Sequence, residues 1–282
     1  MSERGATLAR LAPAIVLLGL AAAWLLPDPA SLRLASSDGA PAERWAAALD
    51  ELPDAPLVLV GFDPDLGTYA EVRPTVRAAL ADLLNRNARL ALISLTPEGR
   101  ALLVTELDRL RRGEANTARL LDLGYLPGAE AALVAIASDP PLPSGAEGEA
   151  ARRLADEGID AVDAMVVVGG NDLGPRSWVE QVGPRVPGTP IVAIAPTVLL
   201  PELQPYLDSG QLAALLGTPR DGATYRAAVD LGALGRLREE GEPPVAALTL
   251  GLLIAVLVIG QAWGRRLVDH VREGRHEAGD GG

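Results

Sequence analysis

Two uncharged apolar segments, one near each end of the chain, constrain the fold more than any other feature of the sequence. The first, residues 11–26, is slightly short for a helix that crosses a bilayer, which needs roughly 17–25 residues. The second, residues 245–263, is long enough and ends in Gln261 and Trp263, which suit the membrane interface. We therefore expect one transmembrane helix at each end, both in contact with the lipid bilayer.

The charges beside these segments predict how the chain is oriented. Arg4 and Arg10 precede the first segment, and Arg265 and Arg266 follow the second. The positive-inside rule then places residues 1–10 and the tail 264–282 in the cytoplasm, with everything between the segments outside it. Two alternatives remain. Residues 11–26 also fit a signal peptide, although Ala40-Pro41-Ala42 is a poor cleavage site, and both segments also fit buried helices of a soluble protein.

The residues between the segments are acidic and lack several reactive side chains. From Asp28 to Pro243 there are 32 acidic residues and 19 arginines, so we expect no binding to nucleic acid. The chain has no lysine and no cysteine, and its two histidines, His270 and His276, both lie in the tail. This composition excludes lysine Schiff bases, Ser-His-Asp and Cys-His catalysis, and zinc sites of cysteine or histidine, from the central domain.

Apolar strand patterns alternate with helical patterns through the middle of the chain. After a linker and short helix in residues 27–52, residues 53–237 form the expected domain, with a less regular stretch at 113–128. This alternation predicts an α/β fold with a mostly parallel, Rossmann-like, doubly wound sheet flanked by helices. The expected strands are 57–62, 90–95, 164–168 and 190–195, and the expected helices are 69–87, 97–112, 129–137, 149–157, 175–186, 199–216 and 221–237.

Polar residues follow the expected strands, where ligands bind in open parallel sheets. Carboxylates such as Asp63 and Asp65 suit a hard cation, so they are also the candidate metal ligands, but aspartates after strands commonly cap turns instead. The glycine-rich run 169–174 presents amides to an anion or simply makes a tight turn. The ligand-binding candidates are Asp63, Asp65, Thr96, Glu98, Asn171, Asp172 and Thr197.

A second group of candidates lies in the segment 201–212. Tyr206 and Gln211 are candidate contacts for a protein partner, because tyrosine and glutamine are scarce in this chain. The alternative interpretation is a helix that ends at Gly210 and is followed by another helix.

The order of these motifs resembles that of haloacid-dehalogenase-type phosphohydrolases. One strand ends in Asp63-Pro64-Asp65, another in Thr96, and a later one in a loop that contains Asp172. The resemblance implies a nucleophilic aspartate, a second aspartate as acid/base, and magnesium. The chain departs from the family at Gly67, where threonine or valine is expected, and in having no lysine.

Other motifs resemble an uncharacterised family of bacterial and archaeal membrane proteins. They are Glu71-Val72-Arg73-Pro74, Ser94-Leu95-Thr96-Pro97-Glu98-Gly99, Leu123-Gly124-Tyr125, Trp178 and Pro205-Tyr206-Leu207. The similarity runs from about residue 43 to 229 and departs from the family at 218–226. It implies an extracytoplasmic α/β domain between two hydrophobic segments and supplies no substrate.

From the sequence we expect a non-catalytic, membrane-anchored module that binds a ligand, or that scaffolds a membrane complex with a membrane or extracytoplasmic protein partner. The alternative is a magnesium-dependent phosphohydrolase of haloacid-dehalogenase type that uses Asp63 and Asp65. A third possibility is a tail that recruits a partner through His270 and His276, or that serves only as a basic flank of the anchor.

Overall fold

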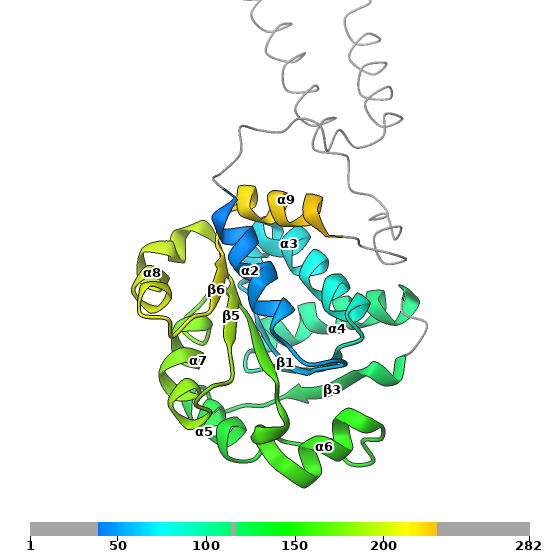
Figure 1. The fold of residues 1–282 in the computed structure, drawn as a ribbon. Coiled ribbons are helices and arrows are strands. Elements are labelled where there is room, and N and C mark those ends of the chain that lie inside the picture. The colour runs from blue at the N-terminus through cyan, green and yellow to red at the C-terminus, as the bar shows by residue number, and fades with distance from the viewer. Residues whose placement is uncertain (1–38, 114–116, 230–282) are drawn as a thin grey trace, which may run out of the picture. The chain divides into compact units, whose positions relative to one another are not determined.

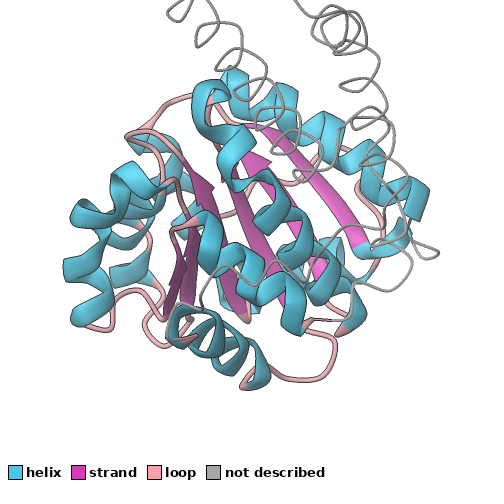
Figure 2. Ribbon diagram, turned by 90° about the horizontal axis from the view of Figure 1, so that it is seen from above, coloured by secondary structure: helices cyan, strands magenta, loops and turns pink. Residues whose placement is uncertain are grey.

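A computed structural model describes residues 39–113 and 117–229. Six strands form one fully parallel sheet in the order β3-β2-β1-β4-β5-β6 (Figures 1 and 2). The direction of winding reverses between β1 and β4, so the expected parallel, doubly wound α/β sheet is confirmed. The strands are β1 (Leu57–Asp63), β2 (Arg89–Ser94), β3 (Leu120–Tyr125), β4 (Ala164–Gly169), β5 (Ile191–Ile194) and β6 (Ala214–Leu216).

Helices cover both faces of the sheet. Strand residues alternate between the two faces: Val58, Val60 and Phe62 of β1 pack against one helical layer, and Leu57 and Leu59 against the other. The first layer comprises α2 (Ala40–Asp50), α3 (Leu66–Asn85), α4 (Pro97–Gly113) and α9 (Pro219–Ala228). The second comprises α5 (Glu130–Ser138), α6 (Glu149–Glu157), α7 (Pro175–Gln181) and α8 (Leu200–Asp208).

Two strands of the sheet differ from the sequence-based expectation. β3 lies in the stretch expected to be irregular. It is an edge strand that pairs only with β2, and Asp122 and Gly124 interrupt its apolar pattern. β6 lies within the residues expected to form a helix over 199–216, since α8 ends at Asp208. The helix expected over 175–186 also ends early, at Gln181, and continues as the 3₁₀ helix η3 (Gly183–Arg185).

The first and last described helices are tied together. The ring of Trp45 in α2 packs edge-on against Tyr225 in α9, with centroids 5.9 Å apart. The Tyr225 hydroxyl donates to Asp82 of α3 at 2.7 Å, Arg86 binds Asp82 at 3.2 Å, and Arg86 also binds Asp50 at 2.6 Å. We call these five residues the terminal clasp. Because of it, α2 is part of the folded domain.

The expected membrane segments are outside the structural description. Within residues 39–113 and 117–229, no helix is long and apolar enough to cross a bilayer. The segments 11–26 and 245–263, the terminal residues 1–10 and 264–282, and the linker up to residue 38 all lie outside the described residues. Their membrane location stays a prediction.

Candidate functional site

The site is built around Asp63, the last residue of β1, at the edge of the sheet where the strands end. We call this side the carboxyl edge. The Asp63 side chain is only 1% exposed, and its Oδ1 accepts four hydrogen bonds. The donors are the Ser94 hydroxyl at 2.8 Å, the Leu95 amide at 2.8 Å, and the amide and hydroxyl of Thr96 at 2.8 and 2.9 Å. Asp63 therefore joins β1 to the turn that follows β2.

The second carboxylate oxygen of Asp63 is in a different environment. Oδ2 is buried and has no hydrogen-bond partner among the described residues. Burial raises the pKa of Asp63 above its ordinary value, and this effect outweighs the opposing hydrogen bonds from Ser94, Leu95 and Thr96. The result is a fixed carboxyl group with one saturated oxygen and one oxygen that can carry a proton.

A glycine lets α4 close over this carboxyl group. A Cβ at Gly99 would lie 2.5 Å from the Phe62 carbonyl oxygen and 2.7 Å from Asp63 Oδ1, so no larger residue fits. The Thr96 hydroxyl accepts from the Gly99 amide at 3.0 Å and caps the helix, and Pro97 occupies its first turn. The sequence Thr96-Pro97-Glu98-Gly99 is thus both a helix start and a wall of the site.

The loop between β4 and α7 lies next to Asp63, where the direction of winding reverses between β1 and β4. The Asn171 amide nitrogen donates to the Asp63 carbonyl at 3.0 Å, and Asn171 itself accepts from the Leu173 and Gly174 amides at 3.0 and 2.9 Å. Gly170 lies so close to Asp65 that a Cβ there would come within 3.0 Å of the Asp65 amide nitrogen. The loop is therefore a tight turn whose amides mostly bond within the protein.

Carboxylates of the chain bind at the starts of α3, α9 and one 3₁₀ helix along this edge. Asp65 caps α3 by accepting from the Gly67 amide at 2.8 Å. Glu71 Oε1 accepts from the amide and hydroxyl of Thr197, at 2.9 and 2.6 Å, in the 3₁₀ helix η4 (Thr197–Leu199) that leads into α8. Asp221 completes a capping box at the start of α9. An external anion therefore meets carboxylates where it would otherwise find free amides.

The structure brings together only some of the predicted site residues. Asp63, Thr96 and Asn171 are connected by hydrogen bonds, and Asp65 lies beside the Asn171 loop. Thr197 is bound to Glu71, farther along the edge. Glu98 and Asp172 have exposed side chains.

A magnesium site at Asp63 and Asp65 stays a prediction. Within the described ranges, no group of three or more acidic, histidine or cysteine side chains is arranged to hold a metal ion.

Sequence reasoning missed two members of the site. Ser94 is buried and donates to Asp63, and its signal was a lone hydroxyl at the end of an apolar strand. Glu71 lies in the second turn of α3, and no local pattern connects it with Thr197, 126 residues away.

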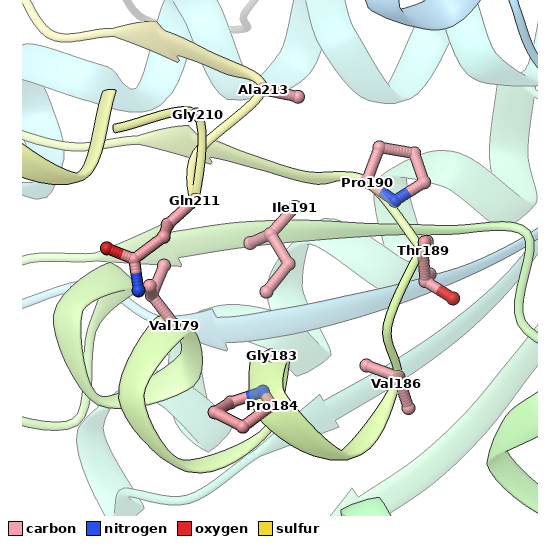
Figure 3. A pocket seen from close by; sticks show the side chains of 11 residues that line it. Val179, Gly183, Pro184, Val186, Thr189, Pro190, Ile191, Gly210, Gln211 and Ala213 are labelled. Carbon is pink, nitrogen blue, oxygen red and sulfur yellow. The ribbon is translucent and has the colours of Figure 1, made fainter. Parts of the chain in front are cut away.

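The predicted contact residues Tyr206 and Gln211 lie apart from Asp63. The Tyr206 hydroxyl hydrogen-bonds to the Glu180 carboxylate and so links α8 to α7. Gln211 lines a pocket of about 420 Å³ at the opposite, amino edge of the sheet, beside the starts of β5 and β6 (Figure 3). The pocket is lined by Val179, Gly183, Pro184, Val186, Gly188, Thr189, Pro190, Ile191, Gly210, Gln211 and Ala213.

The strand order and the two helical layers define a parallel α/β domain of Rossmann-like topology, with Asp63 at the carboxyl edge of its sheet. No protein-family model matches the chain, and a search of the curated proteins finds no match either. Among solved structures, it is similar to trehalose-6-phosphate synthase OtsA, with 15% identity and a TM-score of 0.32 over 90% of this chain. The E. coli protein bound with UDP-2-fluoro glucose gives 16% identity and a TM-score of 0.32 over 89%. The chain spans about half the length of these proteins, 48% in both cases.

These comparisons correct the expected function. From the sequence we expected a non-catalytic module that binds a ligand or scaffolds a complex, whereas the matching solved structures are all of an enzyme. That expectation is wrong and is not retained. With such identities and TM-scores, the likeness transfers no substrate or reaction to this chain.

The phosphohydrolase alternative is not retained either, and here the reason is local geometry. Asp65, the expected acid/base, serves as a helix cap, and of the two Asp63 carboxylate oxygens only Oδ2 is left without a donor among the described residues. Carboxylates also occupy the starts of α3, α9 and the 3₁₀ helix η4, where a phosphate group would need free amides.

Proposed function

We propose that the described domain is an enzyme domain in which Asp63 transfers a proton to or from a substrate bound at the carboxyl edge. The observation that supports this proposal is the asymmetry of the Asp63 carboxyl group. Four donors fix Oδ1, whereas Oδ2 is buried without a partner, and burial raises the pKa. A fixed carboxyl group with a raised pKa is what general acid–base chemistry needs.

The proton balance follows from this geometry. The protonated Asp63 carries its proton on Oδ2 and gives it to a basic oxygen or nitrogen of the substrate. The carboxylate that remains is stabilised by the donors on Oδ1, from Ser94, Leu95 and Thr96. When the substrate returns the proton to Oδ2, the domain is restored to its starting state.

The charges of the carboxyl edge favour a neutral or cationic substrate. Asp65 and Glu71 occupy helix N-termini, and the side chains of Glu98 and Asp172 are exposed nearby along the chain. The whole chain has a net charge of −12 and no lysine. Hydroxyl and amino groups of a substrate can donate to these carboxylates.

Chemical labelling of the full-length chain tests whether a reagent reaches Asp63. Dicyclohexylcarbodiimide reacts with protonated carboxyl groups in apolar surroundings, so peptide mass spectrometry should find label on Asp63 that increases as the pH falls. Asp63→Asn should remove that label, and Asp65→Asn, which changes the half-buried cap of α3, should leave it in place. Label on exposed carboxylates without label on Asp63 would overturn the proposal, because a substrate would be excluded as well.

We further propose that residues 11–26 and 245–263 anchor the chain in a membrane, with both termini in the cytoplasm and the domain outside. The terminal clasp supports this arrangement, because it packs the first described helix, α2, against the last, α9. The start of α2 and the end of α9 lie on the same side of the domain (Figure 1). A domain tethered at both ends to one membrane surface needs its two ends on one side.

The absence of cysteine makes this topology directly testable. Single variants Ser2→Cys and Ser144→Cys would be treated in whole cells with a membrane-impermeant maleimide. Cys at position 144, on an exposed loop of the domain, should react in intact cells, whereas Cys at position 2 should react only after permeabilisation. The reverse pattern, or reaction of both only after permeabilisation, would refute the proposed topology.

A further inference from the structure

We infer that the pocket at the amino edge of β5 and β6 is a second binding site, for a small uncharged molecule that has both an apolar part and a hydrogen-bond acceptor. The pocket is partly open to solvent and has a volume of about 420 Å³, which is within the range of small-molecule sites in proteins. It lies at the starts of the strands, and Asp63 lies at the end of one. The inference therefore does not depend on the proposed role of Asp63.

The walls of the pocket combine apolar side chains with polar groups in about equal measure. Figure 3 shows Ile191 on β5 between Gln211 and Ala213 on one side and Pro184 and Val186 on the other. Ile191 and Val186 are buried against the second helical layer, so the floor is part of the core and does not depend on a mobile surface chain. The apolar part of the lining, around Ile191, favours the apolar part of a ligand.

The charge of the lining decides between ligand classes. None of the lining residues is acidic or basic, although the chain as a whole has a net charge of −12. A charged ligand would lose hydration in this pocket without gaining a partner of opposite charge, so an uncharged ligand is preferred.

Two polar side chains line the pocket and give the ligand an orientation. Gln211 Oε1 accepts from the Ser209 hydroxyl at 2.9 Å, and this bond leaves the amide nitrogen as the donor that Gln211 can offer. The hydroxyl of Thr189 lies on another part of the wall (Figure 3). A carbonyl or ether oxygen on the ligand matches the Gln211 donor.

Ligand-observed NMR with three small compounds tests the inference on the full-length chain. Cyclohexanone combines an apolar ring with one acceptor, and cyclohexanecarboxylate and cyclohexylammonium present similar rings with opposite charges. Cyclohexanone should bind with a millimolar Kd, and both charged compounds should bind at least about tenfold more weakly. Equal binding of all three, or no binding of cyclohexanone at high millimolar concentration, would overturn the inference.

Variants place the binding in this pocket. Ala213→Leu puts a larger side chain into the pocket, which reduces the free volume and should abolish the cyclohexanone signal. Gln211→Leu keeps the size but removes the donor, and should raise the Kd about fivefold, the equivalent of one neutral hydrogen bond. Gln204→Leu is the matched control, because Gln204 is on α8 outside the pocket and pairs with Asp208.

Gln211→Leu changes an exposed side chain, so it keeps the test decisive if Ala213→Leu fails to fold. Binding that survives both pocket variants unchanged would mean that cyclohexanone binds elsewhere, and the inference would be wrong.

Discussion

The two edges of the sheet differ in the side chains that line them: carboxylates at one edge and uncharged residues at the other. At the carboxyl edge, Asp63, Asp65 and Glu71 bind amides and hydroxyls of the chain, so most of their oxygens have partners within the protein. At the amino edge of β5 and β6, uncharged residues surround a pocket of about 420 Å³. The comparison teaches that most polar residues after parallel strands build the domain's own framework and leave the buried Asp63 Oδ2 without a partner among the described residues, while a pocket can also arise where no motif is found.

Asp63→Ala should have the largest effect, because it removes the acceptor that organises the carboxyl edge. The buried amides of Leu95 and Thr96 would lose that acceptor, so the free energy of unfolding should fall by about 3 kcal/mol. Denaturant unfolding followed by tryptophan fluorescence measures this change. Asp63→Asn keeps an oxygen for the same donors and should be close to neutral, and equal losses in both variants would contradict the role of Oδ1.

The pH dependence of Asp63 sharpens the same comparison. Its pKa in the folded chain is raised, so its contribution to stability is fully present below the unfolded pKa, about 3.9, and is lost as the pH rises through the folded pKa. Asp63→Asn has no titrating group at this position. The stability of the unmodified protein relative to this variant should therefore fall as the pH rises from about 4 toward neutrality, and a constant difference would refute the raised pKa.

Gly170→Ala should disturb the carboxyl edge by steric overlap. A Cβ at this position would lie 2.7 Å from the Thr68 hydroxyl and 3.0 Å from the Asp65 amide nitrogen. The β4–α7 loop would have to move away from the start of α3, at a cost of about 2 kcal/mol. The same unfolding measurement checks this value, and Gly67→Ala, which meets only the Asp65 carboxylate at 3.4 Å, provides a control at the same edge.

Gly210→Ala should cost less at the amino edge and for a different reason. Nothing lies within 4 Å of a Cβ at Gly210, but its φ of 75° is in the left-handed region that L residues avoid. We expect a loss of about 1 kcal/mol, with Gly210→Asn losing less because asparagine tolerates this conformation. If both substitutions cost the same, backbone conformation is not the cause.

Glu71→Ala should have the smallest effect on stability and the clearest effect on anion binding. Removing the carboxylate costs about 0.5 kcal/mol, because the contact is exposed to solvent, and it frees the amide and hydroxyl of Thr197. Sulfate should then raise the melting temperature of this variant more than that of the unmodified protein. An unchanged response to sulfate would show that Glu71 does not exclude anions from this edge.

The sequence predicted the central strands well because their apolar runs are long and uninterrupted. β1, β2, β4 and β5 lie within about one residue of the expected ranges, since each is buried on both faces. β3 and β6 were missed for physical reasons. β3 is an edge strand with polar interruptions, and β6 contains only Ala214–Leu216, too short to show any periodicity.

The sequence predicted that the candidate residues lie at the strand ends, but not which hydrogen bonds their side chains make. Strand ends gave Asp63, Thr96 and Asn171 correctly as neighbours, because parallel topology brings these ends together. The sequence could not show that Asp63 has one saturated and one unpartnered oxygen, or that Glu71 reaches Thr197, because both depend on side-chain positions in the folded domain. The pocket at Ile191 has no motif, since turns and prolines shape it.

The terminal clasp has a practical consequence for anyone who shortens this chain. A fragment that starts at β1 would lack Trp45, so the ring of Tyr225 would lose its aromatic partner and β6 would lose the helix that packs against it. A fragment that ends before α9 would leave Asp82 without the Tyr225 hydroxyl. The smallest fragment expected to behave as the intact domain therefore retains both α2 and α9.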